Sequence, residues 1–230
     1  MKAAIVQSQG GVTLAGGAAF SRSLLKKALD LAPVMVAADS GADRLLALGQ
    51  EPAAVIGDFD SVSDQARVRL AGRLHEIAEQ ETTDFDKALR SVDAPFVLGV
   101  GFDGARLDHG LAALNGLVRH PDRVCILLGA KDLVCLAPME IEMRLPVGVR
   151  LSLFPMGAVT GESEGLRWPL QGVAFAPDAM IGTSNEVSAA RVRLRFSVRK
   201  MLLIAPLRAL RPVLQGFGWP DFGHSDARAG

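Results

Sequence analysis

The chain has 230 residues and a mass of 24.3 kDa, enough for one large domain or two smaller ones with well-formed cores. Its 25 basic and 25 acidic residues balance, which argues against a nucleic-acid-binding protein or a protein that binds anionic membranes. The first residues are too polar for a signal peptide, and no apolar run reaches membrane length. Cys125 and Cys135 lie in apolar runs typical of reduced, buried thiols, so we expect a cytoplasmic protein.

The first half of the chain alternates short apolar runs with helical patterns. The runs predict strands at 12–14, 34–38, 53–56, 74–78, 95–100 and 124–128, and the helical patterns lie at about 24–29, 43–48, after 63, 84–92 and 108–119. Strands that alternate with helices indicate a mainly parallel α/β sheet. Ligands of such sheets bind outside the carboxyl ends of the strands, so polar motifs at these ends are candidate ligand sites.

The earliest such motif, Ala38 to Asp43, places Asp39 and Ser40 between a strand and a helix. The N-terminus of a helix offers free N–H groups to a phosphate. Helix capping is an equally common role for both residues. We keep Asp39 and Ser40 as candidate nucleotide-binding residues.

The strand predicted at 53–56 leads into two carboxylates, Asp58 and Asp60, separated by Phe59. If this segment is extended, both carboxylates project to one side and Phe59 projects to the core. Two close carboxylates repel each other unless a cation is present, and Mg²⁺ prefers oxygen ligands. An Asp-rich turn that caps the next helix explains the same residues equally well.

The helix expected at 84–92 separates its polar residues by face. Asp84 and Lys87 share one side and could jointly hold a metal and a phosphate. Asp86 lies on another side, four residues before Arg90, a position that fits helix capping and a surface ion pair. The predicted site therefore includes Asp84 and leaves out Asp86.

The loop 101–109 leads into the next helix and carries two further candidates. Arg106 is suited to clamp a phosphate because its guanidinium is permanently charged and can bond two oxygens at once. Asp108 could cap the helix, contact a metal, or do both.

Beyond Gly129 the pattern changes to short strands separated by Pro and Gly, with no convincing long helix. Strand-like runs lie at 133–137, 140–145, 150–154, from 186 onward and at 191–199. We therefore predict an α/β domain at 1–132, an all-β sandwich-like domain at 133–206 and a tail without clear period at 207–230.

The predicted β domain contains Trp168, between Gly-rich and Pro-containing turns, in a chain with only 5% aromatic residues. A flat cationic ligand stacked on this ring would gain ~0.5–2 kcal/mol. Packing of Trp168 in the core is the alternative.

Six motifs, taken together, resemble the thiamine pyrophosphokinase family in residue type, order and spacing over roughly residues 34–200. They are ADSGADRL at 38–45, GDFDS at 57–61, TDFDKAL at 83–89, GARLDH at 104–109, GLRWPL at 165–170 and TSNE at 183–186. The resemblance implies an α/β nucleotide-binding domain, a β-sandwich-like domain, and a homodimer with the thiamine site between subunits.

For the α/β domain, the resemblance implies that Asp58, Asp60 and Asp84 bind Mg²⁺, with Asp39 and Asp108 nearby. In a similar way, it implies that Lys87 and Arg106 hold the phosphates of ATP. Ala105 is a departure, because bacterial members of the family usually have a second Gly before the Arg.

For the β domain, the resemblance implies that Trp168 stacks on thiamine and that Ser184 and Asn185 line the ligand sites at the dimer interface. The tail beyond about residue 206 has no counterpart in the resemblance.

The implied reaction moves a pyrophosphoryl group from ATP to the hydroxyl of thiamine and gives thiamine diphosphate and AMP. Mg²⁺, Arg106 and Lys87 would neutralise the phosphate oxygens, and Asp84 or Asp108 could accept the hydroxyl proton. Two alternatives use the same acids: a pyrophosphokinase acting on another alcohol such as a hydroxymethylpterin, and a metal-dependent phosphohydrolase that uses water.

Overall fold

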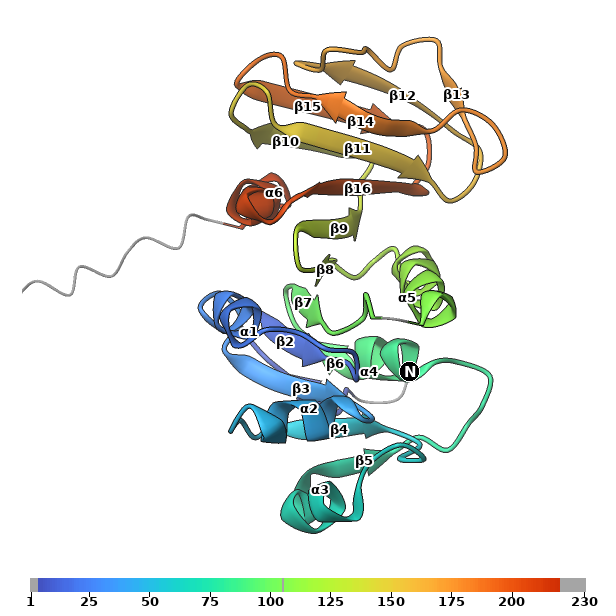
Figure 1. Cartoon of the computed structure of the whole chain (residues 1–230). Coiled ribbons are helices and arrows are strands. Elements are labelled where there is room, and N and C mark those ends of the chain that lie inside the picture. The colour runs from blue at the N-terminus through green and yellow to red at the C-terminus, as the bar shows by residue number, and fades with distance from the viewer. Residues whose placement is uncertain (1–3, 105, 220–230) are drawn as a thin grey trace, which may run out of the picture.

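The computed structural model describes residues 4–104 and 106–219, and one long sheet runs through most of the molecule (Figure 1). This 10-stranded sheet has the order β14-β11-β16-β9-β8-β7-β2-β3-β4-β5. Its strands are β2 Val12–Ala15, β3 Val34–Ala38, β4 Ala54–Gly57, β5 Leu74–Glu76, β7 Val97–Val100, β8 Cys125–Leu128, β9 Asp132–Leu136, β11 Arg150–Pro155, β14 Gly182–Glu186 and β16 Met201–Pro206.

The part of the sheet from β8 to β5 is parallel, which confirms the predicted α/β architecture. Apart from the edge strand β5, its strands are mostly buried and apolar, as expected for a parallel sheet covered on both faces. The covering helices are α1 Arg22–Leu29, α2 Gly41–Ala47, α3 Asp64–Arg69, α4 Asp84–Ser91 and α5 Leu107–Arg119. Buried residues of α1, α2 and α3 share one core cluster and those of α4 and α5 another, so the two groups cover opposite faces.

Strands β2 and β7 are neighbours in the sheet although β3, β4 and β5 separate them in the chain. This switch in strand order opens a crevice between the loops that follow β2 and β7. The loops lie in contact, because a Cβ atom on Gly16 would be only 2.5 Å from the carbonyl oxygen of Gly101. Both positions therefore require glycine. A short parallel pair, β1 Val6–Gln7 and β6 Val92–Asp93, lies beside this half of the molecule.

The C-terminal half is antiparallel and forms the predicted β sandwich. A 4-stranded sheet with the order β10-β15-β12-β13 packs against the β14-β11-β16 end of the long sheet through a shared core. Its strands are β10 Glu140–Arg144, β12 Val159–Glu164, β13 Ala174–Phe175 and β15 Arg191–Phe196. Because β9 pairs directly with β8, the long sheet continues across residues 128–133, and the predicted domain boundary there stays a prediction.

Strand β15 confirms the predicted alternation of arginines and apolar residues, although it ends at Phe196. Val192 and Leu194 are buried, and the arginines face the glutamates of β10. Arg191 and Arg193 both reach the carboxylate of Glu142, at 2.6 and 3.0 Å. The outer face of this sheet is therefore a row of exposed ion pairs.

The tail is more ordered than the sequence pattern indicated. Residues Leu207–Ala209 form a 3₁₀ turn, and Leu210–Gly216 form helix α6, which packs beside β10. The ring of Trp219 lies 5.2 Å from that of Phe96. The absence of a clear period reflects the shortness of this helix, and residues 220–230 lie outside the described part.

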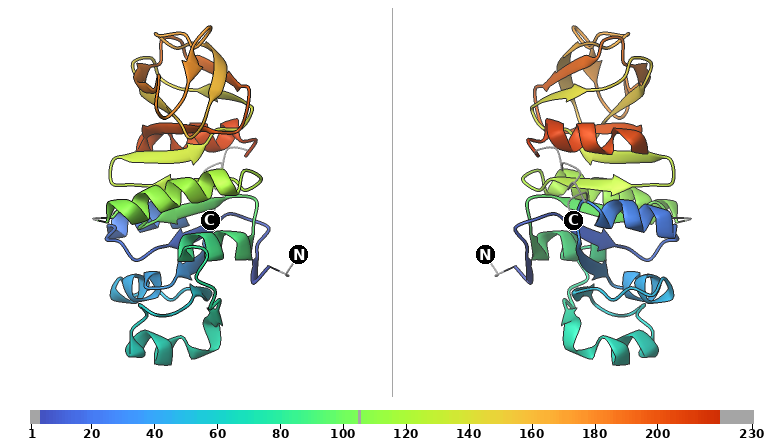
Figure 2. Two further views of the ribbon diagram at one scale, coloured as in Figure 1. Left: turned by 90° about the vertical axis from the view of Figure 1, so that its right-hand side faces the viewer. Right: turned by 90° about the vertical axis from the view of Figure 1, so that its left-hand side faces the viewer.

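Figure 2 shows that the molecule is elongated, with the antiparallel domain at one end and β5 with α3 at the other. In the described residues, no helix is long and apolar enough to cross a membrane. Cys125 and Cys135 are both buried and free.

Candidate functional site

Three carboxylates meet at the carboxyl ends of β3 and β4. Asp39 follows β3, Asp58 and Asp60 follow β4, and one oxygen atom from each lies within 4.8 Å of the others. Asp39 is buried, Asp58 is partly exposed and Asp60 is exposed. The group, named here the acid cluster, is open to solvent on the side of Asp60.

The acid cluster depends on unusual backbone. Asp39 has a φ of 45° and Phe59 a φ of 65°, in the left-handed region that residues with a side chain rarely adopt. The expected extended conformation of 58–60 is therefore wrong: the chain turns at Phe59, whose ring is still buried. Within this turn the backbone N–H of Asp60 donates to Asp58 Oδ1 at 3.3 Å. The turn, and not strand alternation, brings the two carboxylates together.

Within the acid cluster, Asp39 is the carboxylate whose negative charge is the least favourable. Its side chain is buried, and Oδ1 has no hydrogen-bond partner among the described residues. Burial, together with the negative charges of Asp84, Asp60 and Asp58, raises the pKa of Asp39 to about 6. An unpartnered buried oxygen surrounded by acids is an arrangement that a bound cation would relieve.

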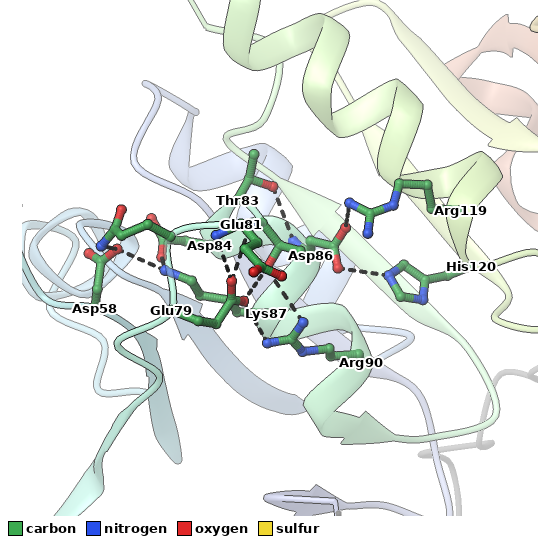
Figure 3. A network of polar contacts seen from close by, with 12 residues as sticks. Asp58, Glu79, Glu81, Thr83, Asp84, Asp86, Lys87, Arg90, Arg119 and His120 are labelled. Carbon is green, nitrogen blue, oxygen red and sulfur yellow. Dashed lines mark hydrogen bonds and ion pairs between the residues drawn. The ribbon is translucent and has the colours of Figure 1, made fainter. Parts of the chain in front are cut away.

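Lys87 connects the acid cluster to α4, as Figure 3 shows. Its side chain is only 1% exposed, and its ammonium group donates to Asp58 Oδ2 at 2.7 Å and to Asp84 Oδ1 at 3.1 Å. The hydrogen bond from Lys87 lowers the pKa of Asp58, whereas burial raises the pKa of Asp84. Gln80, which the sequence analysis missed, also donates to Asp58 Oδ2 at 3.0 Å, and its only sequence signal is its place just before the 83–89 motif.

Asp84 adjoins the acid cluster without being one of its three members. A Cβ atom on Gly57 would lie 3.0 Å from the Cβ atom of Asp39 and 3.2 Å from Asp84 Oδ1, so Gly57 lies between the two acids. The structure thus groups Asp39 with Asp58 and Asp60, where the sequence analysis expected Asp84. The assignment of Mg²⁺ ligands stays a prediction.

Arg106 and Asp108 lie at the start of α5, and both are exposed. The Arg106 guanidinium donates to Asp108 Oδ2 at 2.6 Å, and this hydrogen bond lowers the pKa of Asp108. Arg106 reaches the cavity beside the acid cluster, whereas Asp108 is not among its lining residues. Ala105, where the sequence departs from the family, lies outside the described residues.

A cavity of about 550 Å³ joins these groups at the crevice between β2 and β7. Its lining includes backbone of the glycine-containing loops and the side chains of Asp39, Ser40, Asp58, Asp60, Asp84, Lys87 and Arg106. Ser40 makes no side-chain capping bond at the start of α2, so its hydroxyl is available to a ligand. Most of the residues predicted for nucleotide and metal therefore face one cavity.

Asp86 is placed differently from its prediction. Its side chain is buried, and it pairs with Arg119 and His120 of the α5 end, so the expected surface ion pair with Arg90 is wrong. Arg90 pairs instead with Glu79 at 2.8 Å. The helical wheel gave the face of Asp86 correctly but could not show that α5 covers it.

The β domain holds the other predicted residues together. Trp168 is 53% exposed, which excludes core packing. Its backbone N–H donates to Asn185 Oδ1 at 3.2 Å, and Asn185 Nδ2 donates back to its carbonyl at 2.7 Å. Ser184 has a φ of 60°, and the guanidinium of Arg167 lies 5.0 Å from the centre of the Trp168 ring. Asn185 is buried, so it holds the segment of Trp168 and does not face solvent.

The acid cluster and Trp168 lie far apart in one chain. Asn185 belongs to β14, the first strand in the order of the long sheet, and Asp58 follows β4, the ninth (Figure 1). Neighbouring strands lie about 4.8 Å apart, so the two groups are separated by roughly 35–40 Å along the sheet.

Comparison with known families gives matches in both halves. A family model described as "Thiamin pyrophosphokinase, catalytic domain" matches residues 25–128, and one described as "Thiamin pyrophosphokinase, vitamin B1 binding domain" matches residues 139–203. Between them the two models match well over half of the chain. The chain belongs to the thiamine pyrophosphokinase family. The acid cluster lies within the catalytic match, and Trp168 lies within the vitamin B1 binding match.

Relatives within the thiamine pyrophosphokinase family are distant. Thiamine pyrophosphokinase 2 of rice is 30% identical over 164 residues, which cover 63% of this chain and 61% of the relative. Thiamine pyrophosphokinase 1 of rice is 26% identical over 200 residues, covering 72% of this chain and 76% of the relative. The structure of thiamin pyrophosphokinase from Candida albicans has a TM-score of 0.73 at 14% identity, with 87% of this chain and 92% of that chain covered, and so shares the fold.

Proposed function

We propose that this chain is a thiamine pyrophosphokinase, which transfers the pyrophosphoryl group of ATP to the hydroxyl of thiamine and releases thiamine diphosphate and AMP. The observation that carries the proposal is the acid cluster with its unpartnered, buried Asp39 Oδ1, open to a cavity of about 550 Å³. An acid cluster of this kind suits a polyphosphate with its metal, and it lies in the region matched by the family's catalytic model.

The acid cluster fits Mg²⁺. It offers oxygen ligands alone, three carboxylates converge within 4.8 Å, and one buried oxygen has no partner among the described residues. We assign Asp39, Asp58 and Asp60 as the residues that would hold the ion, with Asp84 beside them. When bound, Mg²⁺ would neutralise charge on the phosphate oxygens of ATP.

The cationic residues have separate roles in this proposal. Arg106 is exposed and bound only to its neighbour Asp108 in the contacts described, so it can exchange that carboxylate for a phosphate. Lys87 is buried between Asp58 and Asp84, where it offsets part of their charge. Lys87 is also among the residues that line the cavity, so it can meet a phosphate oxygen there.

We assign Asp84 as the acceptor of the thiamine hydroxyl proton. Burial raises the pKa of Asp84, whereas the hydrogen bond from Arg106 lowers that of Asp108. The carboxylate with the higher pKa is the stronger base. Asp84 also lines the cavity.

The same proposal requires a homodimer. A thiamine stacked on Trp168 would be roughly 35–40 Å along the sheet from the acid cluster of its own chain. A second copy that places its Trp168 over this cavity would complete the site. The exposure of Trp168 and the buried support by Asn185 suit a ring held ready for such a contact. The two free, buried cysteines support a cytoplasmic location.

The proposal is tested by incubating the purified protein with Mg²⁺, ATP and thiamine and measuring AMP and thiamine diphosphate. We expect equal amounts of both products, and none when Mg²⁺ or thiamine is left out. Phosphate or AMP formed without thiamine would support the phosphohydrolase alternative. Reaction with a hydroxymethylpterin but not with thiamine would show that the pterin alcohol, and not thiamine, accepts the pyrophosphoryl group.

A further inference from the structure

Helix α4 carries a second polar contact on the side away from the acid cluster (Figure 3). Asp86 is 3% exposed, and its two carboxylate oxygens bind different partners. Oδ2 lies 2.8 Å from Nη1 of Arg119, and Oδ1 lies 3.0 Å from Nε2 of His120. The backbone N–H of Asp86 donates to the side chain of Thr83, the N-cap of the helix.

Both partners of Asp86 belong to the C-terminal end of α5. Arg119 is the last residue of this 13-residue helix, and His120 follows it. The other end of α5 begins beside Arg106, about 20 Å away at 1.5 Å per residue. Asp86 thus joins the first turn of α4 to one end of a helix whose other end carries the predicted phosphate clamp.

Apolar contacts join the same elements next to this ion pair. A Cβ atom on Gly116 of α5 would lie 2.7 Å from the ring of Phe85, so this pair of helices is in close contact. The Phe85 ring also meets that of Phe102 edge to face, with centres 4.8 Å apart. Phe102 lies in the loop after β7 that leads to Arg106. Helices α4 and α5 and this loop therefore pack as one unit.

A buried carboxylate is expensive to keep, because desolvation opposes the charge. A hydrophobic residue at position 86 would pack against α5 without this cost. The contacts of the carboxylate are directional, because its two oxygens lie in one plane and bind two different residues of the α5 end. They therefore fix the angle between α4 and α5 more closely than apolar contact does.

We propose that Asp86 is a positioning residue for the pyrophosphoryl transfer. Through Arg119 and His120 it holds α4 against α5, and so it sets the placement of Asp84 and Lys87 relative to Arg106. This inference rests on the proposed function, because its main effect is on turnover.

The test compares Asp86→Asn with Asp93→Asn. Asp93 is a matched control because it also faces a basic residue, Arg123 in the segment between α5 and β8, but its side chain is 67% exposed and the distance is 3.5 Å. For Asp86→Asn we expect kcat to fall about tenfold. The Mg²⁺ concentration for half-maximal rate should rise several-fold, because Lys87, which Asp86 positions, holds the proposed ligand Asp58. The KM for thiamine should stay unchanged, because Trp168 lies in the other domain. Asp93→Asn should match the wild type.

A lower melting temperature with unchanged kcat and Mg²⁺ requirement, measured well below that temperature, would show that Asp86 is only structural and would overturn the inference. If Asp86→Asn does not fold, Arg119→Ala replaces it. Arg119→Ala removes one of the two partners of the Asp86 carboxylate and leaves His120 in place, so it should give a smaller loss of kcat in the same direction.

Calorimetric titration with Mg²⁺ alone separates this inference from the proposed function. If the wild type forms no thiamine diphosphate, the proposed function fails, yet a several-fold weaker Mg²⁺ affinity in Asp86→Asn than in Asp93→Asn would still support the positioning role. Equal affinities, or no Mg²⁺ binding by the wild type, would overturn the inference.

Discussion

At the residue scale, strained backbone coincides with the predicted site residues. Among the described residues, the non-glycine positions with positive φ are Asp39, Phe59 and Ser184. Asp39 belongs to the acid cluster, Phe59 separates two of its members, and Ser184 precedes the residue that holds Trp168. Each such conformation costs on the order of 1–3 kcal/mol, so it persists only where the surrounding structure imposes it. The coincidence supports the assignment of both regions as functional.

Asp60 gives the most direct residue-scale prediction. It is exposed, so Asp60→Asn should leave the fold and melting temperature unchanged. Because the substitution removes a charge from the acid cluster, kcat should fall by about a hundredfold or more, since even residues that only orient metal ligands are worth 10–100-fold. Steady-state kinetics at saturating Mg²⁺ measure this. Asp64→Asn, at an exposed position on α3, is the control, and equal losses in both variants would remove Asp60 from the site.

The Asp39 carboxylate should lower the stability of the metal-free protein, although it belongs to the proposed metal site. Its pKa of about 6 in the folded chain lies above the ordinary value of 3.8, so the folded state binds the proton more tightly than the unfolded state. Stability therefore falls as the pH rises from about 4 to about 6, and above this range the metal-free protein carries a penalty of up to about 3 kcal/mol. Asp39→Asn should raise the melting temperature of metal-free protein near neutral pH, and the gain should shrink toward about pH 5.

Added Mg²⁺ provides the control for Asp39→Asn. It should raise the melting temperature of the wild type, because it binds the folded state, and should do little for the variant. A variant that is less stable than the wild type near neutral pH without metal would show that the Asp39 carboxylate is not the strained group described here.

At the element scale, the apolar elements could be predicted and the polar ones could not. Parallel strands such as β3 and β8 are continuous apolar runs, so their pattern alone locates them. Strands β12 and β14 have the sequences VTGESE and GTSNE, which are as polar as loops, because little of each strand is buried. Helix α6 has the sequence LRPVLQG, and Pro212, which interrupts a helical pattern, hides the little period that seven residues can show.

The candidate site likewise has residues that local patterns indicate and contacts that they do not. Local spacing marked Asp58, Asp60 and Asp84 as candidates, because these acids lie in short motifs, and the family resemblance suggested their role. The grouping of Asp39 with the acid cluster depends on β3 and β4 being neighbours, and the burial of Asp86 depends on α5. Such contacts between distant segments are set by tertiary packing, which no local pattern records.

The segment of Trp168 provides a prediction at the element scale. Asn185→Ala removes both hydrogen bonds to the Trp168 backbone and leaves an N–H and a carbonyl without a partner, at a cost of about 1–3 kcal/mol. We expect a lower melting temperature and a higher KM for thiamine, with the KM for ATP unchanged. Trp168→Ala should raise the KM for thiamine without the loss of stability, because the ring is exposed. An unchanged KM for thiamine in both variants would remove this segment from the site.

At the scale of the whole molecule, the long sheet keeps the two candidate regions apart. Strand β9 pairs with β8 on one side and with β16 on the other, so the backbone hydrogen bonds of the sheet continue from one half into the other. A hinge that brought Trp168 to the acid cluster of its own chain would have to break this sheet. Under the proposed function, the partner that would complete the site is therefore a second copy.

A mixed dimer tests this arrangement of the whole molecule. Asp60→Asn and Trp168→Ala chains, each with low activity as a pure dimer when thiamine is limiting, should recover activity under the same conditions after they are unfolded together and refolded in equal amounts. Half of the dimers then contain one chain of each kind, and each of these has one site with an intact acid cluster from one chain and an intact Trp168 from the other, so about a quarter of wild-type activity should return. A mixture of Asp60→Asn with Asp58→Asn is the matched control and should recover nothing, because every site would keep a damaged acid cluster. If the first mixture is no more active than its components, each chain uses its own Trp168, and the shared site is wrong.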